Sequence, residues 1–139
     1  MNTKTLIIGI AGGIVVFLTG FLIYGILMME YFVNNTKSFP GFNKDPMEIW
    51  AIATGNIIWG ILLAYVFNLG RIKSGSIGAL HGAILFFLFS LGTNIVMYGQ
   101  NNLYSLPLSI VDALCMAILG CIGGAMTAWL LGKISTKTS

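Results

Sequence analysis

The chain has 139 residues, of which 57% are hydrophobic and 8% are charged, and its mean hydropathy is +0.91. So few charges cannot cover the surface of a water-soluble globular domain, and lipid is therefore expected to be the main solvent. The formal net charge of +3 comes from Lys and Arg residues scattered at the ends of apolar segments. Because they form no basic stripe, a nucleic-acid-binding surface is excluded.

Four apolar runs are long enough for a helix that crosses a bilayer, which takes about 20 residues at ~1.5 Å each. We place these helices at about residues 5–33, 46–69, 76–98 and 107–131. The first run is too long for the apolar core of a signal peptide and lacks an A-x-A cleavage site, so we interpret it as a retained helix. The sequence predicts a single all-α domain, a four-transmembrane-helix bundle.

Two of these runs are preceded by residues that are typical of helix starts. In "DPME", Asp45 is the predicted capping residue, Pro46 the first helical residue and Glu48 the partner that completes a capping box. In "SLPL", Ser105 and Pro107 have the equivalent positions. We therefore expect helices to begin at 46 and 107.

Basic residues are distributed unevenly between the two sides of the predicted bundle. One side carries Lys4, Arg71, Lys73, Lys133 and Lys137, and the other carries Lys37 and Lys44. Short cytoplasmic segments are enriched in Lys and Arg. Both termini are therefore predicted to be cytoplasmic.

Three of the four predicted helices contain glycines spaced four residues apart. These are Gly9 and Gly13, Gly78 and Gly82, and Gly120 and Gly124. Small residues at this spacing let membrane helices approach closely, although glycine is also common in membrane helices generally. We expect these glycines to pack helices within the bundle, and a homodimer formed through one motif is the alternative.

The strongest candidate site is a set of polar side chains in the outer half of the bundle. Counted at ~1.5 Å per residue from the outer helix ends, Asn94 lies ~6 Å deep, Tyr24 and Asp112 ~8 Å, and Asn56 ~15 Å. Asp112 is the one acidic residue well inside an apolar segment. Tyr24 shares a helix face with Gly20 and should point into the bundle. We therefore expect Asp112, Asn94, Asn56 and Tyr24 to form one polar layer.

Two interpretations of Asp112 stay open, because a carboxylate inside a membrane helix needs polar partners or a hydrated cavity. In one interpretation, Asp112 lines an outward-facing pocket in which the Asn and Tyr side chains orient a ligand or a proton-coupled substrate. In the other, Asp112 accepts hydrogen bonds from Asn56, Asn94, Tyr24 or the outer loop and locks the bundle together.

His81, the single histidine, lies ~8 Å from the cytoplasmic end of its predicted helix. One histidine without further ligands at suitable spacing does not make a metal or haem site. We expect a hydrogen-bonded packing role with Tyr65 as the candidate partner, and a proton relay to Asp112 is the alternative. The sequence also contains no Ser-His-Asp set, phosphate loop or paired acidic site, so we predict no catalytic residue, metal or cofactor.

The stretch "NNLYSLPLSIVDALCMAILGCIGGAMTAW" is similar to the C-terminal pattern of a bacterial family of small four-helix membrane proteins catalogued as a domain of unknown function. The matching positions are Asn102, Leu103, Tyr104, Pro107, Asp112, Gly120, Gly124 and Trp129. In the first helix, "GFLIYG" at 20–25 resembles the family's aromatic-Tyr segment. The resemblance implies a four-helix architecture and a multi-pass location in a bacterial inner (plasma) membrane.

Two classes of function follow from these observations. The first is a non-catalytic accessory, sensor or partner-binding bundle, whose partners are the lipid bilayer and another membrane protein or a second copy of the chain. The alternative is a proton-coupled transporter or a small-molecule-binding bundle centred on Asp112. Small multidrug exporters have a similar size, but they carry an essential Glu in the first helix, where this chain has only Glu30 at the outer edge.

Overall fold

The computed structural model describes residues 2–136, and its ordered elements are all helical. They are α1 (Thr3–Leu22), a π-helical turn (Ile23–Leu27), α2 (Met29–Asn35), α3 (Ile49–Leu69), α4 (Gly75–Gln100) and α5 (Leu106–Thr136). Within the described residues, four segments are long and apolar enough to cross a membrane, namely Thr3–Leu27, Ile49–Leu69, Gly75–Gln100 and Leu106–Ile134. The predicted all-α fold with four membrane-length helices is confirmed.

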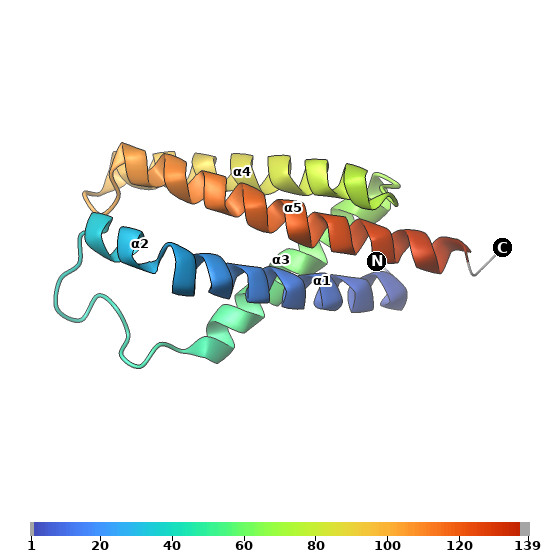
Figure 1. The fold of residues 1–139 in the computed structure, drawn as a ribbon, viewed down its shortest axis with the longest axis horizontal. Coiled ribbons are helices and arrows are strands. Elements are labelled where there is room, and N and C mark those ends of the chain that lie inside the picture. Colours follow the sequence, from blue (N-terminus) through green and yellow to red (C-terminus); the bar gives the residue numbers. More distant parts are fainter. Residues whose placement is uncertain (1, 137–139) are drawn as a thin grey trace.

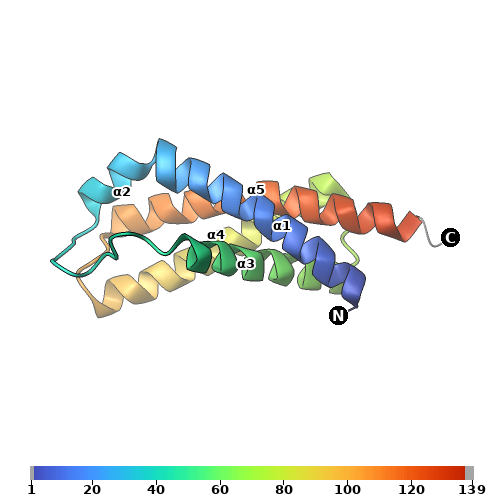
Figure 2. The ribbon, with the colours of Figure 1, turned by 90° about the horizontal axis from the view of Figure 1, so that it is seen from below.

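The four long helices pack in two different ways. α4 and α5 run antiparallel and side by side along most of their length, whereas α3 crosses α1 at an angle (Figure 1). Figure 2 shows that α1 also lies along α5, so that α1 joins the two halves of the bundle. The largest fully buried apolar side chains, Phe67, Leu63, Leu108 and Val16, come from α1, α3 and α5.

The two ends of the bundle differ in charge. At one end α1 begins, α5 ends and residues 70–74 join α3 to α4 (Figure 1). We call this the basic end, because it carries Lys4, Arg71, Lys73 and Lys133. Lys137, which is also predicted to lie on this basic side, is outside the described residues. The opposite end, here the loop end, holds α2, residues 36–48 and the α4–α5 connection, and there Lys37 N donates a hydrogen bond to Leu103 O at 3.3 Å.

The contact between α4 and α5 is built on glycines. A Cβ added to Gly82 would lie 2.1 Å from Gly120 O, and one added to Gly120 would lie 2.2 Å from Gly82 O. Gly78 and Gly124 meet one turn further along, where a Cβ on Gly124 would lie 2.3 Å from Gly78 O. Because the atoms in the way belong to the backbone, they cannot rotate aside. The glycine pair of α4 and the glycine pair of α5 therefore pack against each other within one chain.

Glycines also form the crossing of α1 and α3. Cβ atoms added to Gly9 and Gly13 would lie 2.6 Å from Ile61 Cα and 2.4 Å from Ile57 Cα. Gly60, which the four-residue spacing does not identify, would place a Cβ 2.1 Å from Gly13 N. The crossing point is thus a three-glycine contact, and α3 diverges from α1 toward the loop end (Figure 1).

The first predicted helix, residues 5–33, is interrupted near its end. Met28 N donates to Ile23 O at 2.7 Å, which closes a π turn, and Met28 itself leaves the helical region with φ −112° and ψ 5°. α2 then starts in a new direction (Figure 2). The Tyr24 ring packs against Phe32 of α2 with centroids 5.0 Å apart. The two rings thus pack across the interruption, which apolar periodicity does not predict.

The two predicted helix starts have different outcomes. α3 begins at Ile49 and not at Pro46, and Glu48 makes no capping hydrogen bond, and its carboxylate pairs with Lys44. The predicted capping box is therefore absent. At α5, Leu108 N donates to Ser105 Oγ at 3.3 Å, so Ser105 caps this helix as the sequence predicts.

Candidate functional site

Asp112 lies in the second turn of α5, and its carboxylate is fully engaged with neighbouring helices. Oδ1 accepts a hydrogen bond from Tyr24 Oη at 2.8 Å. Oδ2 accepts one from Ser90 Oγ at 2.7 Å and one from Asn94 Nδ2 at 2.6 Å. We call these four residues the Asp112 cluster. Because a carboxylate in hydrocarbon must be paired, this cluster ties α5 to α4 and to the π turn after α1.

Ser90 is the member of the cluster that the sequence does not identify. Its side chain is 6% exposed, and its hydroxyl also accepts from Asn94 Nδ2 at 3.2 Å. A serine in a membrane helix is common and usually bonds to its own backbone, so its residue type carries little information. Ser90 lies four residues before Asn94, so both side chains are on one face of α4. This spacing is the sequence feature that could have identified Ser90 as a member of the cluster.

Two tyrosines toward the loop end lie near the Asp112 carboxylate. Tyr24 lies within the π turn, and such turns insert an extra residue that redirects the side chains of a helix. Tyr104, in the connection before α5, lies outside the membrane-length segments. Burial, and then the negative charge of Asp112, raise the pKa of the Tyr104 phenol above its ordinary value. Tyr104 is therefore a half-buried neighbour of the Asp112 carboxylate at the α4–α5 connection.

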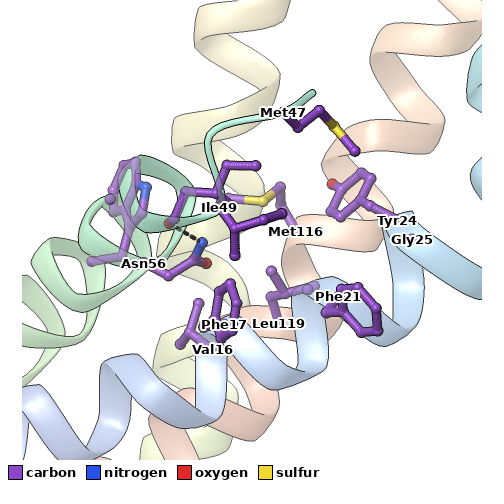
Figure 3. Close-up of a pocket in the computed structure, with 14 residues that line it drawn as sticks. Val16, Phe17, Phe21, Tyr24, Gly25, Met47, Ile49, Asn56, Met116 and Leu119 are labelled. Carbon is purple, nitrogen blue, oxygen red and sulfur yellow. Dashed lines mark hydrogen bonds between the residues drawn. The ribbon is translucent and has the colours of Figure 1, made fainter. Parts of the chain in front are cut away.

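A cavity of about 500 Å³ lies beside the cluster, between α1, the N-terminal half of α3 and α5. Figure 3 shows its walls, which are mostly aliphatic and aromatic side chains. They include Phe17, Phe21, Ile52, Trp59, Met116 and Leu119, and Met47 lies toward the loop end. This volume is in the range of cavities that hold small molecules.

Two polar side chains line this cavity, Tyr24 and Asn56 (Figure 3). Asn56 Nδ2 donates to Ile52 O in its own helix at 2.8 Å, and this fixes the orientation of the amide. Asn56 Oδ1 points toward the cavity, where it accepts no hydrogen bond from any residue that the structure describes. The cavity therefore offers one oriented acceptor in an apolar surround.

The predicted polar layer is thus divided. Tyr24, Asn94 and Asp112 lie together, whereas Asn56 lies across the cavity and does not bond to Asp112. Asp112 is not among the residues that line the cavity. Tyr24 belongs to both groups, because its ring faces the cavity and its hydroxyl donates to the carboxylate.

His81 and Tyr65 are not brought together in a hydrogen bond within residues 2–136. His81 Nδ1 lies 2.9 Å from Ile77 O, so the imidazole donates to the backbone of its own helix. The Tyr65 side chain is 45% exposed. Among the described residues, no group of three or more His, Cys, Asp and Glu side chains is placed to hold a metal ion.

No family model, curated protein or solved structure matches the chain. The description of the site therefore depends on its own geometry. This geometry consists of a hydrogen-bonded carboxylate cluster and, adjoining it through Tyr24, an apolar cavity with the free acceptor Asn56 Oδ1.

Proposed function

We propose that this protein is a non-catalytic membrane sensor that binds an amphipathic small molecule in the cavity between α1, α3 and α5. The supporting observation is the combination of about 500 Å³ of apolar volume with a single oriented acceptor, Asn56 Oδ1. An apolar wall favours a hydrocarbon chain, and an acceptor among apolar side chains favours a ligand that donates one hydrogen bond. The ligand class is therefore a single apolar chain that carries a hydroxyl or amide N–H.

Asp112 has a supporting role in this proposal. Its carboxylate is satisfied by three donors and lies outside the cavity lining, so proton coupling at Asp112 is not included. The bond from Tyr24 to Asp112 instead holds one wall of the cavity in place. Occupation of the cavity would then affect the π turn and α2, which pack through Tyr24 and Phe32.

The proposed location is a bacterial inner membrane with the basic end in the cytoplasm. The excess of Lys and Arg at that end and the resemblance to the bacterial four-helix family support this orientation. The cavity, which lies in the half of the bundle toward the loop end, would then be in the outer leaflet. Ligands of this class would reach it from the lipid phase.

Trp59 provides a direct measurement of binding, because its indole lines the cavity. In a background with Trp50→Phe and Trp129→Phe, Trp59 is the only tryptophan of the chain. A monoacylglycerol with a brominated chain is the probe, since bromine quenches indole fluorescence at contact. We expect saturable quenching, and quenching that rises linearly with probe would contradict the proposal by showing contact with bulk lipid only.

Two glycines form a matched pair of variants for this experiment. Gly55 lines the cavity, Gly92 lies on α4 away from it, and a Cβ at either position would meet nothing within 4 Å. Gly55→Leu should therefore extend a side chain from an open position into the cavity and weaken binding at least ~tenfold, whereas Gly92→Leu should leave it unchanged. Equal effects of both variants would contradict the proposed location.

The role of Asn56 is tested with a second probe, a methyl ester of the same brominated chain. The ester has no hydrogen-bond donor, so the monoacylglycerol should bind about fivefold more tightly, which corresponds to one hydrogen bond. In Asn56→Leu this preference should disappear. If Asn56→Leu still prefers the monoacylglycerol to the methyl ester, the Asn56 amide is not the group that binds the ligand.

A further inference from the structure

The start of α3 does not reach as far toward the loop end as the neighbouring helices do. α3 has 21 residues and α4 has 26, so α3 is ~32 Å long and α4 is ~39 Å long. In both views α3 begins inward of the ends of α2 and α4 (Figures 1 and 2). A tilted helix of ~32 Å barely spans the ~30 Å hydrocarbon layer of a bilayer. The segment at 36–48 therefore has to descend to the hydrocarbon boundary to reach Ile49.

Large apolar side chains are exposed along this descent. Their exposed fractions run from 39% for Phe42 to 70% for Trp50. The rings of Phe39 and Phe42 pack on each other with centroids 5.1 Å apart. Exposed apolar side chains that cluster in this way mark surfaces that contact a protein or a membrane. We call this set the loop-end apolar patch, and it consists of Phe39, Phe42, Met47, Ile49 and Trp50.

The polar groups of the same segment determine how deep it can lie. Irregular backbone that faces lipid is not tolerated in the hydrocarbon layer, because its N–H and C=O groups would lose their partners. Lys44 and Glu48 pair with each other, and Lys37 is exposed. Lysine side chains can extend to the headgroups while their stems lie on apolar surface, and aromatic side chains are favoured at the same level. The composition of the segment thus fits the headgroup layer.

Protein packing holds the N-terminal half of α3 only weakly. Residues 49–59 are half-buried or exposed. This half forms one wall of the cavity, through Ile49 and Ile52 among others. The buried residues of α3 all lie in its C-terminal half, and they are Gly60, Leu63, Ala64 and Phe67. The angle between this half of α3 and α1 therefore needs a further support at the start of α3.

We propose that residues 38–50 are an interfacial anchor whose partner is the lipid headgroup layer at the loop end. The loop-end apolar patch reaches the first carbons of the acyl chains, and the paired Lys44 and Glu48 stay among the headgroups. The patch is continuous with the lipid-facing surface of α3, because Ile49 and Trp50 form the first turn of this membrane-length helix. The anchor fixes the depth at which α3 begins and keeps α3 apart from α1. This role does not require that the cavity binds a ligand.

Fluorescence quenching of single tryptophans measures the depth of the segment. In a background with all three native tryptophans replaced by Phe, Phe42→Trp places one indole in the patch. Asn102→Trp is the matched control, because Asn102 is exposed on the α4–α5 connection, beyond the end of the longer helix α4. The full chain is reconstituted into phosphatidylcholine vesicles that contain phosphatidylcholine brominated near the headgroup end of its chains.

We expect the brominated lipid to quench Phe42→Trp at least ~twofold more strongly than Asn102→Trp, and aqueous iodide to quench them in the reverse order. Equal access of iodide to both indoles would overturn the proposal, because the segment would then lie in water. Both results should be independent of the protein-to-lipid ratio. An indole at 42 that becomes accessible only when the protein is diluted in lipid would show that a second copy covers the patch, and this would also overturn the proposal.

The anchoring role is tested with Trp50 as the single tryptophan, in a chain with Trp59→Phe and Trp129→Phe. Phe39→Ser combined with Phe42→Ser should raise the quenching of Trp50 by iodide about twofold, because the start of α3 loses its hold on the acyl chains. Thr36→Ser combined with Asn43→Ser changes polar residues of the same segment and should leave Trp50 as it is. Unchanged quenching in the variant without the two phenylalanines would overturn the anchoring role.

Discussion

Replacement of Asp112 by Leu tests whether the carboxylate holds the bundle together. The substitution keeps a side chain of similar size but removes the carboxylate that accepts from Tyr24 Oη, Ser90 Oγ and Asn94 Nδ2. Longer contacts remain, from Asn94 Nδ2 to Ser90 Oγ and Ser109 O and from Tyr24 Oη to the backbone oxygen of residue 112. A side-chain hydrogen bond inside a membrane protein contributes roughly 0.6–1.7 kcal/mol. Three such bonds predict a loss of roughly 2–5 kcal/mol in the free energy of unfolding.

A double-mutant cycle with Tyr24→Phe separates the bonds from general packing. Tyr24→Phe removes one bond of 2.8 Å and should cost about 1 kcal/mol in the wild-type chain. In the Asp112→Leu chain the same change should cost much less, because the carboxylate is gone and only the 3.4 Å contact from Tyr24 Oη to the backbone oxygen of residue 112 is left to lose. Unfolding by SDS in mixed micelles, followed by circular dichroism, measures each free energy.

The competing effect is the desolvation of the carboxylate, which a leucine would relieve. If desolvation dominates, Asp112→Leu will be neutral or stabilising and the structural role given to the cluster is refuted. Additive effects of the two substitutions would refute the direct coupling of Tyr24 and Asp112. Thr93→Val is a suitable control on α4, because Thr93 Oγ1 is exposed and donates only to Phe89 O in its own helix, at 2.9 Å. Its effect should stay within about 0.5 kcal/mol.

Two further predictions concern the close helix contacts. Gly82→Ala would place a Cβ 2.1 Å from the backbone oxygen of Gly120 and should destabilise the bundle by about 1–3 kcal/mol in the same unfolding assay, whereas Gly92→Ala should not destabilise it. Gly12→Ala would place a Cβ 2.3 Å from Thr127 Oγ1 but leaves 3.5 Å to Thr127 Cβ. Adding Thr127→Ala should therefore recover most of the stability lost in Gly12→Ala, and an additive loss would contradict this contact.

The Asp112 cluster and the cavity differ in how their polar groups are used, although they share Tyr24. In the cluster, every oxygen of the carboxylate is used between helices, which favours rigidity. In the cavity, Asn56 keeps an acceptor that no described residue uses, which favours a ligand. A ligand that moves the Tyr24 ring would therefore act on the joint between α1 and α2.

Much of the architecture follows from the sequence by itself. Hydropathy is a property of each segment, so four membrane-length helices are predictable from apolar length. The glycine pairs in α4 and α5 are predictable as close contacts because only small residues permit such an approach. The association of Tyr24, Asn94 and Asp112 follows from their similar depth and from the need of a carboxylate in lipid for partners.

The lateral arrangement is decided by the tertiary structure alone. Depth counting places Asn56 near the same layer, but α3 crosses α1 at Gly60 and Gly13 and then diverges, so Asn56 faces the cavity instead of Asp112. Hydropathy does not predict the π turn at Ile23–Leu27 either. A π turn changes the hydrogen-bond register of the backbone and does not depend on how apolar the side chains are. Hydropathy and spacing report the position of a residue along its own helix, whereas crossing angles depend on how whole surfaces fit together.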